Sequence, residues 1–174
     1  GYLMEIRGKI IKYGDNIDTD VIIAGHRLVY GSNISLMSKY AMETVDKDFH
    51  VKIGSGRNII VSGRNFGSGS SRQQAAEVLK ECGIRLIISD SMARIFYRNA
   101  VNIGLPVLIA EGISSITEDG DVIEADLESG EIKNLSNLKS LNAKPIPPFL
   151  LDILSAGGLV NHLKNRIHQL EVGK

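Results

Sequence analysis

The sequence has very little cysteine and few aromatic residues. Cys82 is the only cysteine among 174 residues, tryptophan is absent, and aromatic residues make up 5% of the chain. A single cysteine excludes an internal disulfide, and it excludes a zinc or iron–sulfur site built only from thiolates of this chain. Any iron–sulfur chemistry would therefore depend on cysteines of another chain, and Cys82 itself is best interpreted as part of a helix core.

The sequence also lacks an excess of either charge and any long apolar run. Lys plus Arg and Asp plus Glu both number 20, so the formal net charge at pH 7 is zero. A chain without net positive charge has no overall electrostatic attraction to nucleic acid or to an anionic membrane. Its apolar runs are far shorter than the ~20 residues of a membrane span, and no signal peptide is visible. We expect a cytoplasmic protein with no nucleic-acid or membrane partner.

The chain does have enough apolar residues for one core. Hydrophobic residues make up 43% of its 174 positions, which suits a single compact domain. Met4 is expected to be the native start, with Gly1–Leu3 as an addition to it. The predicted domain therefore covers residues 4–174.

Short apolar runs alternate with helical patterns up to residue 110. The patterns predict strands at residues 5–12, 58–62, 85–90 and 105–110, a buried strand beginning at residue 21, and helices at residues 34–42, 75–82 and 91–102. Ser91 is expected to cap the last of these helices. This order of elements predicts parallel strands that are joined by right-handed crossovers.

The later part of the chain has a different pattern. The stretch DVIEADLESGEIKNL predicts a hairpin about Ser129–Gly130, and three prolines then precede two helices separated by Gly157–Gly158. We expect the hairpin and the helices to serve packing and to offer a surface for homo-oligomers of the isolated chain. The fold class is therefore α/β, with parallel strands, flanking helices and an antiparallel hairpin.

A turn rich in glycine and serine, NFGSGSSRQQAAEVL, lies between a predicted strand and a predicted helix. Such a turn leaves backbone N–H groups unpaired at the positive end of the helix dipole, where a carboxylate or phosphate can bind. Ser70 and Ser71 add hydroxyls, and Arg72 can hold a carboxylate through two parallel hydrogen bonds. The alternative is an ordinary helix start, with Ser68 or Ser70 as N-cap and a solvated arginine.

Known nucleotide and hydrolase motifs do not fit this turn. A Walker loop needs a lysine after its last glycine, and the dinucleotide pattern G-x-G-x-x-G needs a glycine where Arg72 stands. The stretch Gly67–Gly69 lacks the spacing of the nucleophile elbow G-x-S-x-G. A hydrolase stays an alternative, because a serine could still meet one of the four histidines in the folded chain: His26, His50, His162 or His168.

Two stretches of the chain resemble a known family. Residues 65–109, from NFGSGSSR to GLPVLI, are similar to the signature of the swivelling domain of the aconitase superfamily, and GDNIDTDVIIAGHRLVY is similar to the first motif of that domain. The resemblance covers about residues 5–168 and implies a swivelling β/β/α domain. This domain is fused to the cluster-bearing part in aconitase but is a separate small subunit in other members, and this chain resembles the separate type.

The resemblance implies a role for each residue of the two motifs. Ser70 would be the catalytic base, acting as an alkoxide, while Ser71 and Arg72 would bind a substrate carboxylate. Asp20, in the stretch Asp18–Asp20, would lie at the edge of the active site, although aspartates in a turn also serve local backbone N–H groups. The 4Fe–4S cluster would be held by a partner large subunit and would polarise the leaving hydroxyl as a Lewis acid, with no metal held by this chain.

The substrate implied by the resemblance depends on the stretch Leu28–Tyr30. Val29 presents an apolar side chain and would leave a buried carboxylate unpaired, so a substrate with an isopropyl or methyl group is expected. Arg27 stands where the family pattern has tyrosine, and it could pair with an additional carboxylate if the loop turned.

The resemblance therefore implies a hydro-lyase subunit that is active only with its large subunit. The expected reaction interconverts 2-isopropylmalate and 3-isopropylmalate in leucine biosynthesis, with citramalate as a further hydroxy-dicarboxylate substrate. The small subunit of a homoaconitase is an alternative because of Arg27. An alternative of another class is a regulatory module that binds an anion at the serine-rich turn without catalysis.

Overall fold

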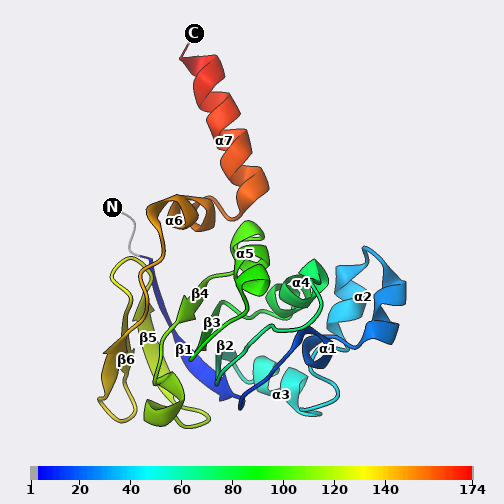
Figure 1. The fold of residues 1–174 in the computed structure, drawn as a ribbon, viewed down its shortest axis with the longest axis vertical. Coiled ribbons are helices and arrows are strands. Elements are labelled where there is room, and N and C mark those ends of the chain that lie inside the picture. Colours follow the sequence, from blue (N-terminus) through cyan, green and yellow to red (C-terminus); the bar gives the residue numbers. More distant parts are fainter. Residues whose placement is uncertain (1–3, 174) are drawn as a thin grey trace.

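A computed structural model describes residues 4–173 of the chain. The segment Gly1–Leu3, expected to be an addition to the native chain, lies outside the described residues, as does Lys174. The described residues build one mixed sheet of seven strands in the order β4-β3-β2-β1-β5-β6-β7 (Figure 1). Its strands are β1 (Glu5–Lys12), β2 (Arg57–Ser62), β3 (Leu86–Ser89), β4 (Val107–Ile109), β5 (Val122–Asp126), β6 (Glu131–Asn134) and β7 (Ser140–Asn142).

The sheet has a parallel half and an antiparallel half. Strands β1 to β4 pair in parallel, whereas β5 pairs antiparallel with both β1 and β6, and β6 pairs antiparallel with β7. Residues such as Ile59, Ile60 and Val61 are fully buried in the middle of the parallel half, as expected for strands covered on both faces. The predicted α/β class, the parallel pairing and the hairpin about Ser129–Gly130 are confirmed.

Helices connect the strands and cover the sheet. They are α1 (Thr19–Ile22), α2 (Ile34–Ser38), α3 (Phe49–Gly54), α4 (Gln73–Glu81), α5 (Arg94–Asn102), α6 (Pro148–Ser155) and α7 (Leu159–Val172), with the short 3-10 helices η1 (Gly25–Tyr30) and η2 (Ile113–Ile116). The helices α4 and α5 follow β2 and β3 along the chain, as the sequence predicts. The small elements α1, α3, η1 and β7 are not part of the prediction.

Two local predictions are wrong. The segment after Asp18 is a helical turn and not a buried strand, because the Asp18 carboxylate accepts a hydrogen bond of 2.8 Å from the Val21 N–H and starts a helix. Ser91 does not cap α5, whose N-cap is Ala93. The Ser91 hydroxyl instead accepts a hydrogen bond of 2.9 Å from the Asn65 N–H and so joins two loops.

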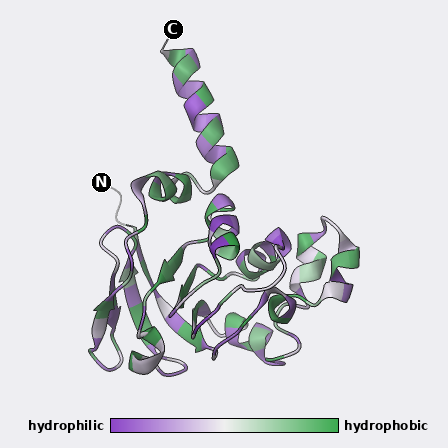
Figure 2. Cartoon of the chain, viewed as in Figure 1, coloured by the Kyte–Doolittle hydropathy of each residue, from purple (hydrophilic) through white to green (hydrophobic). Residues whose placement is uncertain are grey.

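The C-terminal helix α7 projects from the body of the molecule (Figure 1). It carries no buried residue, and hydrophobic and hydrophilic residues alternate along it (Figure 2). Exposed apolar residues on it include Val160, Leu163, Ile167 and Leu170. The expected use of this part as an oligomer surface stays a prediction. No helix among residues 4–173 is both long and apolar enough to cross a membrane.

Gly67 packs the start of the serine-rich turn onto the core. Its φ angle is +75°, and a Cβ atom there would overlap the Cβ and Cγ atoms of Phe96. Phe96 in turn packs edge-on against Phe66, with the ring centroids 5.2 Å apart. Only glycine combines this backbone angle with this close approach.

Replacing Gly67 with alanine should therefore destabilise the protein by about 2 kcal/mol or more, through backbone strain and overpacking against Phe96. Urea unfolding followed by circular dichroism measures the change. Gly54→Ala is the matched control, because no atom lies within 4 Å of the added Cβ. Equal midpoints for the two variants would contradict the packing role of Gly67.

Candidate active site

The two sequence motifs meet beyond the carboxyl ends of the parallel strands. Because β1 and β2 are parallel neighbours, the loops that follow them emerge at the same edge of the sheet, where α/β proteins commonly bind ligands. The Asn16 N–H donates to the Arg64 carbonyl at 2.7 Å, and the Gly67 N–H donates to the Ile17 carbonyl at 2.7 Å. On its other side the serine-rich turn is held by Ser91, whose carbonyl accepts from the Phe66 N–H at 3.1 Å.

Thr19 is the closest link between the motifs. Its backbone N–H donates to the Ser68 carbonyl at 2.9 Å, and its hydroxyl donates to the Ser70 carbonyl at 3.0 Å. The side chain is almost fully buried, so water does not easily replace these bonds. The backbone at Ser70 is thus fixed by a residue that lies 51 positions earlier in the sequence.

Arg72 and Asp20 form an ion pair between the same loops. One terminal nitrogen of Arg72, Nη1, donates to an Asp20 carboxylate oxygen and lies 3.5 Å from the Ile23 carbonyl oxygen. The Arg72 side chain is mostly buried, whereas that of Asp20 is largely exposed. Neither Nε nor Nη2 of Arg72 has an acceptor within residues 4–173. The pair therefore orients the guanidinium and leaves donors for a second carboxylate.

The residues Ser70 and Ser71 are exposed beside this ion pair. Their hydroxyls, and the backbone N–H groups of both serines and of Arg72, have no hydrogen-bond partner in the described part of the chain. The helix α4 begins at Gln73, and its N-cap is Arg72, without a side-chain cap. The alternative of a serine-capped helix is therefore wrong, and the unpaired donors form a surface suited to an anion.

The stretch Leu28–Tyr30 lies on η1, which begins next to the ion pair. A Cβ atom on Gly25 would lie 3.5 Å from Nη2 of Arg72 and 3.8 Å from the carboxylate of Asp20. Leu28 packs partly against the core, but Val29 is 80% exposed. The ring of Tyr30 stacks on Tyr40, with centroids 5.6 Å apart and planes 17° from parallel.

Arg27 points toward Glu43 and not toward the serines. Its Nε and Nη2 donate to the two carboxylate oxygens of Glu43 at 3.0 and 3.1 Å. The guanidinium carbon lies 3.7 Å from the centroid of the Tyr40 ring. The structure therefore places Ser70, Ser71, Arg72 and Asp20 together, with the start of η1 beside them.

Cys82 and the histidines lie in other surroundings. The Cys82 thiol donates to the Ser38 carbonyl at 3.3 Å, and burial, with a smaller contribution from the charge of Glu81, raises its pKa to about 12. Cys82 is half-buried at the end of α4, in partial agreement with its predicted place in a helix core. His50 is bonded to the Ser38 carbonyl at 2.9 Å.

The structure gives no support to a serine hydrolase or to a metal site within this chain. No histidine is hydrogen-bonded to a serine hydroxyl in residues 4–173. Nor does the described part of the chain contain three His, Cys, Asp or Glu side chains placed to hold a metal ion.

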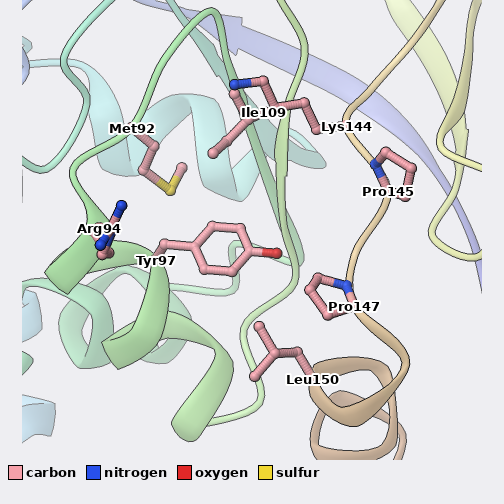
Figure 3. A pocket seen from close by; sticks show the side chains of 8 residues that line it. All are labelled: Met92, Arg94, Tyr97, Ile109, Lys144, Pro145, Pro147 and Leu150. Carbon is pink, nitrogen blue, oxygen red and sulfur yellow. The ribbon is translucent and has the colours of Figure 1, made fainter.

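A cavity of about 360 Å³ lies between α5 and the proline-rich segment before α6 (Figure 3). Tyr97 reaches into it between Met92 and Arg94 on one side and Pro147 and Leu150 on the other (Figure 3). None of the predicted site residues lines this cavity. Ser70, Ser71 and Val29 are instead exposed at the surface.

Comparisons with known proteins identify the family. The Aconitase C-terminal domain matches residues 4–112. The chain is 48% identical over 163 residues to the 3-isopropylmalate dehydratase small subunit of Pyrobaculum calidifontis, covering 94% of this chain and 99% of the relative. It is 46% identical over 162 residues to the isopropylmalate/citramalate isomerase small subunit of Methanocaldococcus jannaschii, covering 93% and 95% of the two chains.

A solved structure is similar over nearly the whole chain. The crystal structure of 3-isopropylmalate dehydratase from Methanocaldococcus jannaschii superposes with a TM-score of 0.90 at 40% sequence identity, and the match covers 98% of this chain and 100% of that chain. The family and fold implied by the sequence motifs are therefore confirmed.

Sequence patterns do not reveal three contributors to this region. Thr19 stands inside a recognised motif, but its threonine hydroxyl carries no signal that it anchors Ser70. Tyr40 and Glu43 lie outside both motifs, and their contacts with Arg27 depend on the tertiary fold. The one signal in the sequence is the charge of Arg27 itself. A charged side chain that is partly buried needs a partner of opposite charge, which indicates an acidic neighbour.

Thr19→Val should loosen the serine-rich turn, because it removes the hydroxyl that donates to the Ser70 carbonyl. We expect a loss of about 1 kcal/mol in the free energy of unfolding, as for one hydrogen bond. Amide hydrogen exchange should become faster at Gly67 and Ser68, whose N–H groups are hydrogen-bonded in the native turn. Thr44→Val, at an exposed threonine, is the control. Unchanged exchange at Gly67 and Ser68 would show that Thr19 does not hold the turn.

Proposed function

This chain belongs to the aconitase C-terminal domain family, and we propose that it is the small subunit of a 3-isopropylmalate dehydratase. In this role it is a hydro-lyase subunit that interconverts 2-isopropylmalate and 3-isopropylmalate by dehydration and rehydration, in leucine biosynthesis. The observation that carries the proposal is the pairing of the two family motifs at one sheet edge, where Ser70 is exposed beside the Arg72–Asp20 pair.

Ser70 is the proposed catalytic base. A serine hydroxyl is a very weak acid, so its alkoxide form needs strong stabilisation. The unpaired N–H groups at the start of α4 and the Arg72 guanidinium supply positive charge and donors on this side of the site. As an alkoxide, Ser70 takes the proton from the carbon next to a substrate carboxylate.

The substrate carboxylate is proposed to bind Arg72 and Ser71. Asp20 already holds one arm of the Arg72 guanidinium, which orients the remaining donors without a large loss of side-chain freedom. Ser71 offers a hydroxyl and a backbone N–H beside them. Asp20 therefore acts in this proposal as the residue that positions Arg72 at the edge of the site.

The partner in this proposal is a large subunit that carries the 4Fe–4S cluster. The residues of this chain do not fit such a cluster, because it needs several cysteine thiolates and the chain has only Cys82. The exposed surface around Ser70 and Val29 supports completion by another chain. A cytoplasmic location, and self-association of the isolated chain through apolar surface such as that of α7, also stay predictions.

The proposed substrate carries a small branched alkyl group. Val29 presents an exposed apolar side chain near the end of η1. Such a side chain favours an isopropyl or methyl group over a further carboxylate. Citramalate is a plausible second substrate for the same reason. The homoaconitase alternative needs a free cationic group on this loop, but Arg27 is engaged by both oxygens of Glu43.

The proposal predicts that Ser70→Ala abolishes turnover. The chain is mixed anaerobically with its cognate large subunit, and the hydration of isopropylmaleate is followed. Loss of a positioned base should lower kcat by at least about 10²-fold. Ser140→Ala, at an exposed serine of β7, is the control. A Ser70→Ala complex with normal turnover would exclude Ser70 as the base.

The same assay tests the class of the substrate. Isopropylmaleate and citraconate should be hydrated with a higher kcat/KM than homoaconitate, because Val29 offers apolar contact and no cation. Preference for homoaconitate would favour the alternative enzyme. If no substrate is turned over while a dicarboxylate still binds both the native chain and Ser70→Ala, the non-catalytic anion-binding module is the better description.

A further inference from the structure

Arg27 is enclosed by a cluster of side chains that no sequence motif predicts. Both carboxylate oxygens of Glu43 accept hydrogen bonds from it, at 3.0 and 3.1 Å. Its third nitrogen, Nη1, donates to the Tyr30 hydroxyl at 3.4 Å. The Tyr40 ring covers one face of the guanidinium at 3.7 Å. This is the planar two-bond geometry in which Arg binds a carboxylate best, with a cation–π contact added.

The cluster leaves Arg27 no nitrogen without a partner. All three nitrogens of the guanidinium bond to Glu43 or Tyr30, and the hydrogen bonds with Glu43 raise the pKa of the arginine further above its usual range. The arginine side chain is three-quarters buried. A substrate carboxylate would therefore meet a guanidinium whose charge Glu43 already balances.

The cluster also fixes the loop that carries Val29. Arg27 is held by Glu43 on one side of Val29, and Tyr30 is held by stacking on Tyr40 on the other. The start of η1, at Gly25, packs beside Arg72. Val29 itself is 80% exposed between these fixed points, so its position depends on residues that lie outside the loop.

We propose that Glu43 is a specificity-determining residue, which withholds the charge of Arg27 from the substrate and so makes η1 select an alkyl group over a third carboxylate. This inference rests on the proposed function and adds a residue to it. Glu43 acts through Arg27 and is therefore a positioning residue. When Glu43 is charged, the loop offers the substrate the apolar side chain of Val29. When the charge of Glu43 is removed, the loop also offers the guanidinium of Arg27 without its ionic partner.

Glu43→Gln removes the charge with little change of shape. In the complex with the large subunit, the variant should accept homoaconitate better relative to isopropylmaleate. We expect the ratio of kcat/KM for isopropylmaleate to kcat/KM for homoaconitate to fall at least about tenfold, the low end of the discrimination that one changed pocket contact gives. The change should be found mainly in KM for homoaconitate, because the reacting groups are unchanged.

Two further variants separate the proposed role from a structural one. Adding Arg27→Gln to Glu43→Gln should return the ratio toward that of the native protein, since the freed guanidinium is then absent. Glu131→Gln removes the carboxylate of a different ion pair, with Lys133, whose side chains are 51% and 54% exposed. It should leave the ratio unchanged.

The outcomes distinguish this inference from the proposed function. If Glu43→Gln lowers kcat/KM for both substrates equally, or if the double variant keeps the altered ratio, the inference is overturned. An inactive native complex contradicts the proposed function. The inference then fails as well, unless Arg27 binds a tricarboxylate in Glu43→Gln. Binding of the tricarboxylate homoaconitate to Arg27 is measured from the ¹⁵N signal of the Arg27 Nε–H. In the native chain Glu43 should protect this N–H from exchange, and added homoaconitate should not change the signal. In Glu43→Gln added homoaconitate should shift it.

Discussion

The candidate site depends on the bonds between the segment Ile17–Thr19 and the serine-rich turn. Each segment is irregular, and neither would hold its shape alone, because a turn with glycine at positions 67 and 69 loses much conformational freedom on folding. The parallel pairing of β1 with β2 brings the segments together. Thr19 then fixes Ser68 and Ser70 through their carbonyls, while the hydroxyl and the N–H of Ser70 keep no partner within the described residues.

Two arginine–carboxylate pairs lie near each other but have opposite chemical consequences. Arg72 is bonded to Asp20 through one terminal nitrogen and keeps further donors for a ligand. Arg27 is bonded to Glu43 through two nitrogens and to Tyr30 through the third, so its charge is already satisfied. The same residue type thus keeps donors available for a ligand in one place and has a hydrogen bond on every guanidinium nitrogen in the other. The number of nitrogens engaged, and not the presence of an ion pair, makes the difference.

The sequence predicts the architecture, and its motifs name the residues of the candidate site, but it does not predict their contacts. The buried strands and the helices α4 to α7 follow from apolar periodicity and from glycine and proline signals, and the two motifs locate Ser70, Arg72 and Asp20. The buried residues after Asp18 are mistaken for a strand, because four residues of helix have no periodicity to distinguish them. The partnership of Arg27 with Glu43 is not predictable, since it spans 16 positions and depends on how η1 turns.

The bonds that join the two motifs are long in sequence, and this has a consequence for folding. Thr19 and Ser70 are 51 residues apart, and Asp20 and Arg72 are 52 apart. Contacts at such separation carry a loop-closure cost, so they form only after distant parts of the chain have come together. Ser70 is therefore ordered only after the loops that follow β1 and β2 have met. A nascent or partly unfolded chain would present no organised site to a partner, so assembly is coupled to completed folding.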